Sequence, residues 1–114
     1  IPELKGKLEG LAIRVPTPNV SLVDLVFNSK NNLSIKKINE SFKKASKKEL
    51  QNILETTDEK LVSTDFNHNP SSAIVDLSLT NVVGNNMGKV TAWYDNEWGF
   101  ASRMCDLVEY IHKI

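Results

Sequence analysis

The chain has 114 residues, of which 40% are hydrophobic and 25% are charged, so it can bury one hydrophobic core but not the cores of two ordinary domains. Its 14 basic side chains balance 14 acidic ones, which argues against a nucleic-acid binder, and no apolar run is long enough to cross a membrane. The single cysteine excludes an internal disulfide framework and no signal-peptide pattern occurs, so we expect a cytoplasmic protein.

The first predicted strand covers residues 10–15, where apolar residues alternate with Ala12 and Arg14. The Arg14 guanidinium would then project from a strand face, and Pro16 and Pro18 would end the strand and stiffen the connection after it. A guanidinium held in this way can bind a phosphate or carboxylate through two parallel hydrogen bonds. The alternative is an arginine on a solvated face or in an ordinary ion pair.

A second strand is predicted over residues 21–28, and a helix follows from an N-cap at Ser34 to about Ser46. Apolar residues recur at helical spacing on its inner face: Ile35, Ile38, Phe42 and Ala45. Its outer face and the residues after it are rich in lysine: Lys36, Lys37, Lys43, Lys44, Lys47 and Lys48. Without interleaved aromatic residues, such a run is better explained as a solvated helix face than as a nucleic-acid contact.

The middle of the chain predicts short strands joined by turns. Strands are expected over residues 54–56, 62–66, 73–77, 80–83 and 89–94. Residues 84–88 form the best hairpin turn, because Gly84 and the two asparagines that follow it readily accept positive φ. Together these elements predict an α+β fold, with a mixed, largely antiparallel sheet and helices packed against one face.

The densest aromatic segment is residues 93–100, where a strand runs into a helix and both tryptophans occur. The apolar residues after it recur at helical spacing: Phe100, Met104, Leu107, Val108 and Ile111. Asp95, Asn96 and Glu97 therefore lie at the junction. Two interpretations stay open, because sequence spacing cannot separate them. Either Asp95 or Asn96 caps the helix, or the Asn96 carboxamide pairs with a similar amide group on a ligand.

Few residues are candidates for a nucleophile, a base or a metal ligand. Cys105 lies in the final helix beside the apolar stripe, and His112 is about 10 Å further along the axis, too far for a Cys–His pair. His68 falls in a turn-like run, where a loop residue is a better explanation than a base. No metal-ligand spacing and no Gly-x-Gly-x-x-Gly fingerprint occur. We expect no catalytic residue and no metal ligand here.

Several blocks, in order, resemble the C-terminal part of the catalytic domain of phosphorylating glyceraldehyde-3-phosphate dehydrogenase. They span nearly the whole chain: Ile1-Pro2-Glu3-Leu4-Lys5-Gly6-Lys7-Leu8, Arg14-Val15-Pro16-Thr17-Pro18-Asn19-Val20-Ser21, Val23-Asp24-Leu25, Ile53-Leu54, Val62-Ser63-Thr64-Asp65-Phe66 and Trp93-Tyr94-Asp95-Asn96-Glu97-Trp98-Gly99. The resemblance implies that Arg14 binds the phosphate of a sugar-phosphate substrate. It also implies that Asn96 hydrogen-bonds the nicotinamide carboxamide of NAD or NADP.

Two positions depart from the family pattern. The resemblance implies an aromatic ring beside the nicotinamide at Phe100, where many members carry tyrosine, and phenylalanine keeps the ring without the hydroxyl. Gly88 replaces a branched apolar residue that is often found before the last strand, which we expect to weaken that strand slightly.

The family's reaction also needs a cysteine thiolate, a histidine base and a nucleotide-binding domain, and no matching motif occurs in this sequence. Because the chain also opens at Ile1 without an initiator methionine, we expect residues 1–114 to be the C-terminal portion of the catalytic domain of a longer, homotetrameric enzyme. The resemblance implies oxidation of glyceraldehyde 3-phosphate with inorganic phosphate, and the segment alone is expected to be inactive. The alternatives are a sister enzyme acting on erythrose 4-phosphate, or a non-catalytic assembly module.

Overall fold

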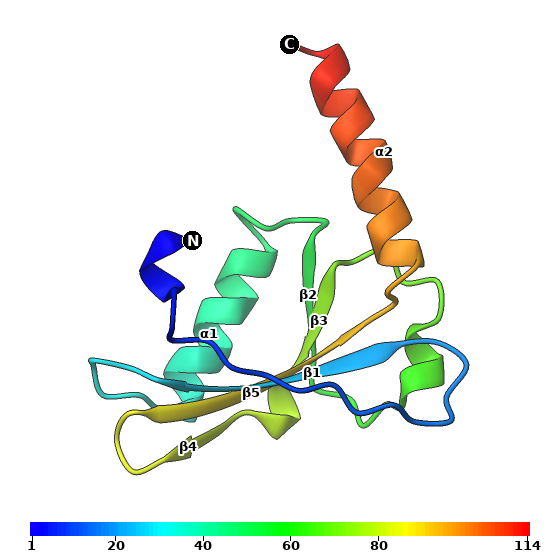
Figure 1. Ribbon diagram of the computed structural model, residues 1–114. Coiled ribbons are helices and arrows are strands. Elements are labelled where there is room, and N and C mark those ends of the chain that lie inside the picture. The colour runs from blue at the N-terminus through cyan, green and yellow to red at the C-terminus, as the bar shows by residue number, and fades with distance from the viewer.

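A computed structural model describes residues 1–114 and contains one five-stranded sheet with two helices rising from the same side of it (Figure 1). The elements in chain order are β1 (Ser21–Asn28), α1 (Ile35–Ser46), β2 (Leu54–Thr57), β3 (Ala73–Asp76), β4 (Asn81–Val83), β5 (Met87–Tyr94) and α2 (Trp98–His112). Short 3-10 helices cover Pro2–Leu4, Ser63–Phe66 and Leu77–Leu79.

Strand β5 is the centre of the sheet. It pairs along its whole length with β1, while β4 and β3 share its other edge and β2 lies beyond β3. Only β2 and β3 are parallel; all other pairs are antiparallel. The predicted α+β class and its mixed, largely antiparallel sheet are therefore confirmed. The β1–β5 register sets Ser21 opposite Tyr94, so β1 begins beside the end of β5.

Two small clusters of buried side chains form the core, one on each face of the sheet. Ile74 and Val75 are consecutive in β3 and therefore point to opposite faces. On the α1 face, Val75 packs with Leu54, Leu77, Phe42 and Ala45. On the other face, Ile74 packs with Val20, Phe66, Leu61 and Trp93. Helix α1 begins as predicted, because the Ser34 side chain accepts a hydrogen bond from the Lys37 N–H at 3.2 Å.

The predicted strand over residues 10–15 is wrong. This segment has no regular secondary structure, and in Figure 1 the dark-blue chain crosses the sheet without joining it. The side chains of Leu11 and Ile13 are 83% and 79% exposed, so the alternating pattern does not bury an apolar face. A strand needs a ladder partner for its backbone groups, and no strand of this chain pairs with this one. Arg14 therefore lies on an irregular, exposed segment.

The predicted strand over residues 62–66 is also wrong, because Ser63–Phe66 forms a 3-10 helix. Local hydrogen bonds replace a strand ladder here. The Asp65 side chain accepts from the Val62 N–H at 2.7 Å, and the Asp65 N–H donates to the Val62 carbonyl at 3.0 Å. This turn directs Phe66 into the core, where its ring stacks on Trp93 with centroids 5.6 Å apart.

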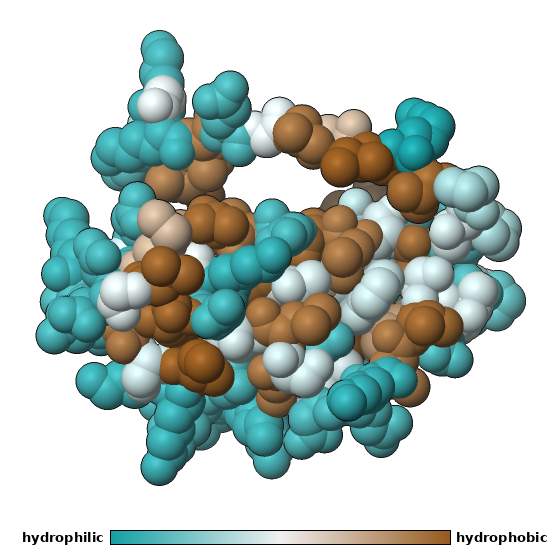
Figure 2. Space-filling model, turned by 90° about the horizontal axis from the view of Figure 1, so that it is seen from below, coloured by the Kyte–Doolittle hydropathy of each residue, from teal (hydrophilic) through white to brown (hydrophobic).

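Much apolar surface stays uncovered. Helix α2 projects away from the sheet, and its apolar residues include Phe100, Val108 and Ile111, each more than half exposed (Figure 1). Seen from the side away from the helices, apolar patches lie between hydrophilic ones (Figure 2); on the strand β1, Leu22 and Val26 are exposed. Neither helix combines the length and apolarity needed to cross a membrane.

Candidate functional site

Asp95 follows the last residue of β5 and its side chain is 1% exposed. Its Oδ1 accepts hydrogen bonds from the backbone N–H groups of Trp98 at 2.9 Å and Glu97 at 3.1 Å. These donors lie at the start of α2, where N–H groups have no partner inside the helix. The capping role therefore belongs to Asp95, since Glu97 occupies the N-cap position without a side-chain capping bond.

The second carboxylate oxygen of Asp95 connects two distant segments. Its Oδ2 accepts from Asn19 Nδ2 at 2.8 Å and from the backbone N–H of His68 at 2.9 Å. Burial alone would raise the pKa of Asp95, but its hydrogen bonds from three backbone N–H groups and one side-chain amide outweigh burial. They hold the pKa of this carboxyl below the ordinary aspartate value, so it is ionised at neutral pH.

Asn96 is exposed and takes no part in the helix cap. Its Oδ1 accepts one long hydrogen bond, 3.5 Å, from the Ser21 hydroxyl, and its Nδ2 donates to no group of the chain. A carboxamide offers two donors and one acceptor oxygen with two lone pairs. Asn96 therefore retains both donors and acceptor capacity for a ligand.

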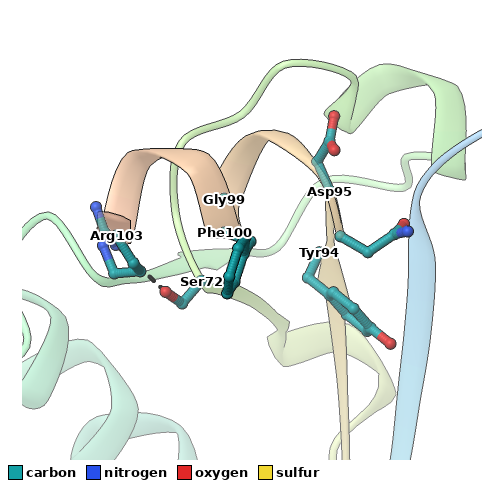
Figure 3. A pocket seen from close by; sticks show the side chains of 7 residues that line it. Ser72, Tyr94, Asp95, Gly99, Phe100 and Arg103 are labelled. Atoms are coloured by element: carbon teal, nitrogen blue, oxygen red, sulfur yellow. Dashed lines mark hydrogen bonds between the residues drawn. The ribbon is translucent and has the colours of Figure 1, made fainter. Parts of the chain in front are cut away.

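A shallow pocket of about 280 Å³ lies beside Asn96 at the β5–α2 junction (Figure 3). Its lining residues come from the end of β5, the first turns of α2 and the loop before β3: Ser72, Tyr94, Asp95, Asn96, Gly99, Phe100 and Arg103. In Figure 3 the Phe100 ring stands between Tyr94 and Arg103. The pocket thus combines an exposed apolar ring with amide, hydroxyl and guanidinium groups.

Arg103 anchors α2 and is not among the site residues that the sequence predicts. Its Nη1 donates to the carbonyl of Asn52 at 3.1 Å and to the Ser72 hydroxyl at 3.3 Å (Figure 3), and its guanidinium pairs with Asp106 at 2.8 Å. The i, i+3 spacing to Asp106 predicts the ion pair. The contacts to Asn52 and Ser72 cross 51 and 31 residues, so no local pattern indicates them.

The first turn of α2 lies close to the backbone before β3. A Cβ on Gly99 would lie 3.0 Å from the Ser71 carbonyl oxygen, so any larger residue would require this backbone contact to open by a few tenths of an ångström. This contact brings the start of α2, and with it Phe100, against the rest of the pocket.

Arg14 does not line this pocket. It is exposed and makes no hydrogen bond or ion pair within the chain. The segment that carries it nevertheless reaches the junction, because Asn19 bonds to Asp95 and Ser21 bonds to Asn96. The structure thus brings together the ends of the two sequence-predicted segments rather than Arg14 and Asn96 themselves. The phosphate-binding role of Arg14 stays a prediction.

The other candidate residues lie apart from one another. Cys105 is exposed on α2 and lines an open, largely apolar groove with Met104, Val108 and Glu109. The His68 ring packs against Trp98 with centroids 4.6 Å apart and ring planes tilted by 38°. No group of three or more His, Cys, Asp or Glu side chains is arranged to hold a metal ion.

A family model described as "Glyceraldehyde 3-phosphate dehydrogenase, C-terminal domain" matches residues 1–96. The chain belongs to this family. It is 51% identical over 111 residues to glyceraldehyde-3-phosphate dehydrogenase 2 of Bacillus subtilis (strain 168), a match that covers 97% of this chain and 33% of that protein. It is 52% identical over 113 residues to glyceraldehyde-3-phosphate dehydrogenase 2 of a Synechocystis strain, covering 99% of this chain and 34% of that protein.

A chloroplast protein of Arabidopsis thaliana, glyceraldehyde-3-phosphate dehydrogenase GAPB, is 51% identical over 97% of this chain and 25% of its own length. The chain thus spans a quarter to a third of the curated relatives it matches. These findings confirm the resemblance inferred from the sequence blocks: the chain matches the C-terminal part of glyceraldehyde-3-phosphate dehydrogenases. Because the relatives include bacterial and chloroplast proteins, a cytoplasmic location stays a prediction.

Proposed function

We propose that residues 1–114 are the C-terminal portion of the catalytic domain of a phosphorylating glyceraldehyde-3-phosphate dehydrogenase and supply two of its ligand contacts. The observation that carries this proposal is the exposed Asn96 carboxamide, which is free of the helix cap and borders a pocket with Phe100. The nucleophile, the base and the dinucleotide-binding unit come from the rest of a longer, homotetrameric protein.

Asn96 is the proposed nicotinamide contact. Its free Nδ2 donors and its Oδ1 match the acceptor and donors of the carboxamide of NAD or NADP. The exposed ring of Phe100 is the apolar surface that would lie against the flat nicotinamide. The bound cofactor supplies the hydride acceptor, and this chain's contribution is to fix which face of the ring meets the substrate.

Arg14 is the proposed contact for the phosphate of glyceraldehyde 3-phosphate, with inorganic phosphate as the second substrate. An exposed guanidinium with no partner in the chain keeps all five N–H donors for an oxyanion. Pro16, Pro18 and the Asn19–Asp95 hydrogen bond restrict the segment that follows it. Such restriction lowers the entropy lost when Arg14 binds a phosphate.

Replacing Arg14 with alanine in the full-length enzyme tests this proposal. We expect the KM for glyceraldehyde 3-phosphate to rise by about tenfold to hundredfold, which corresponds to roughly 1.5 to 3 kcal/mol for hydrogen bonds to a charged group. Arg14→Lys should recover only part of the loss, because an ammonium lacks the planar fork. Steady-state kinetics with glyceraldehyde 3-phosphate and erythrose 4-phosphate would also identify the preferred aldehyde.

Lys30→Ala provides the matched control, since Lys30 is another exposed cation, in the loop beyond the opposite end of β1. The KM of the Lys30→Ala enzyme for glyceraldehyde 3-phosphate should equal that of the unmodified enzyme. An unchanged KM in Arg14→Ala would contradict the assigned phosphate contact.

A further inference from the structure

The Asp95 carboxylate is the meeting point of three segments that are far apart in the sequence. Two of its four hydrogen bonds come from Glu97 and Trp98 at the start of α2. The third comes from His68, 27 residues away, and the fourth from Asn19, 76 residues away. Each carboxylate oxygen accepts two of these bonds, and every donor is neutral. This buried carboxylate forms no ion pair, and its hydrogen bonds all come from these four neutral donors. The same bonds hold the donor segments in place.

In two of the joined segments the backbone is strained, either at the residue that donates to Asp95 or directly after it. Val20, which directly follows Asn19, has φ +68°, and His68 has φ +62°. A β-branched residue in the left-handed region is a true outlier, and such strain persists only where surrounding contacts over-determine it. Val20 is buried in the core, and its neighbour Asn19 is fixed by Asp95. The carboxylate therefore helps to hold a conformation that the local sequence disfavours.

We propose that Asp95 is a positioning residue that sets the Arg14 segment and the Asn96–Phe100 segment in one fixed arrangement. Through Asn19 it holds the chain five residues after Arg14, and by capping α2 it orients the adjacent Asn96. This inference rests on the proposed function of Arg14 and Asn96. It adds that the phosphate and nicotinamide contacts depend on the same buried carboxylate.

The chemistry of the Asn19–Asp95 pair makes the proposal testable by exchange. Asparagine at position 95 can still accept from the α2 N–H groups, but its NH₂ would face the donors of Asn19 and His68. Aspartate at position 19 would accept that NH₂ and so restore the bond between the segments. The exchanged pair therefore rebuilds the link between positions 19 and 95, while the His68 N–H loses its acceptor and the Asn67 Oδ1 loses the hydrogen bond that Asn19 donates.

The experiment compares Asp95→Asn, Asn19→Asp and the double exchange in the full-length enzyme. We expect Asp95→Asn to raise the KM values for both the sugar phosphate and the nicotinamide cofactor by about tenfold or more, because small misplacements of binding groups have large effects. The double exchange should bring both KM values back toward those of the unmodified enzyme.

Asp76→Asn is the matched control. Asp76 is also buried and also caps its own short helix, accepting from the Ser78 N–H at 3.0 Å, but it does not line the pocket. It should lower stability while both KM values stay unchanged. Asp95→Asn would overturn the proposal if it lowered only the amount of active enzyme, left both KM values unchanged and showed no recovery in the double exchange. The carboxylate would then have a purely structural role.

Three other variants, Asn19→Ala, Arg14→Ala and Asn96→Ala, separate the possible outcomes. Should Asp95→Asn fail to fold, Asn19→Ala removes the same link from a half-buried position and is expected to raise both KM values more modestly; unchanged values would overturn the proposal. Arg14→Ala and Asn96→Ala test the proposed function itself. If these two variants weaken substrate and cofactor use while Asp95→Asn and Asn19→Ala do not, only the positioning role fails.

Discussion

Asp95 and Asn96 are neighbours in the sequence but lie in opposite environments. The carboxylate is 1% exposed and accepts four hydrogen bonds, whereas the carboxamide is exposed and accepts one long bond. Successive side chains at the end of a strand point in opposite directions, so one turns inward and the other outward. Capping, which the sequence pattern could not assign to one of these two residues, thus falls on Asp95 and leaves the Asn96 carboxamide free for the proposed ligand contact.

The depressed pKa of Asp95 predicts a pH-dependent contribution to stability. Asp95→Asn should lower the free energy of unfolding at pH 7 by about 2 kcal/mol, through a weakened cap and unpaired buried donors. A carboxyl whose folded-state pKa is lowered stabilises the fold above its unfolded pKa of about 3.9, and this contribution disappears as pH falls through the folded value. Urea unfolding should therefore show the two proteins converging below about pH 4; a constant difference would contradict this.

At the scale of elements, the packing of β5 against β1 places Gly88 opposite Phe27. The two residues are cross-strand partners, and a Cβ on Gly88 would lie 2.5 Å from Phe27 Cζ. Glycine in a strand usually weakens it, but here the missing side chain makes room for an aromatic ring. The arrangement, in which an aromatic ring covers a glycine on the neighbouring strand, is known as aromatic rescue.

Gly88→Ala should therefore destabilise the chain by about 1 kcal/mol, because the Phe27 ring must leave its position. In a Phe27→Ala background the same substitution should become neutral or stabilising, since alanine costs less conformational entropy than glycine. Thermal and urea unfolding of the four proteins in this double-mutant cycle would measure the coupling. Equal effects in both backgrounds would show that the ring and the glycine are independent.

At the scale of the whole molecule, the chain is extended for its length. Its radius of gyration is 15.5 Å, whereas a compact domain of this size has about 13 Å. Only 15 of 114 residues are buried, because α2 and the N-terminal segment project from the sheet (Figure 1). Apolar side chains on α2 and on the sheet face therefore remain in contact with water, a surface that normally pairs with other protein.

The isolated 114-residue chain should accordingly self-associate at micromolar concentrations and bind no nicotinamide cofactor measurably. Contact through one exposed carboxamide and one ring is too little to offset the entropy of association. Sedimentation velocity and cofactor titration by fluorescence would test both statements. Val108→Lys, on the exposed face of α2, should reduce association, whereas Lys30→Ala should not. A single well-defined oligomer without cofactor binding would instead favour the assembly-module hypothesis.

Local sequence patterns are sufficient to predict several elements of this fold and the family of the chain. The Ser34 cap and the helical spacing of the apolar residues after it predict α1. The strands predicted over residues 21–28 and 89–94 correspond to β1 and β5. Met87 and Gly88 are predicted in the turn but belong to β5. These features depend on neighbours within a few residues, which is why periodicity and capping chemistry reveal them. The family blocks identify the segment for the same reason, because they are read from consecutive residues.

Other features depend on contacts between distant residues, and only the fold establishes them. Residues 10–15 have a strand pattern, but no strand of this chain pairs with them. Nothing near Asp95 in the sequence indicates that Asn19, 76 residues away, is its hydrogen-bond donor. Backbone and buried polar groups need hydrogen-bond partners, and distant parts of the chain can supply them. Strand pairing, burial and the joining of the Arg14 and Asn96 segments therefore follow from the three-dimensional arrangement.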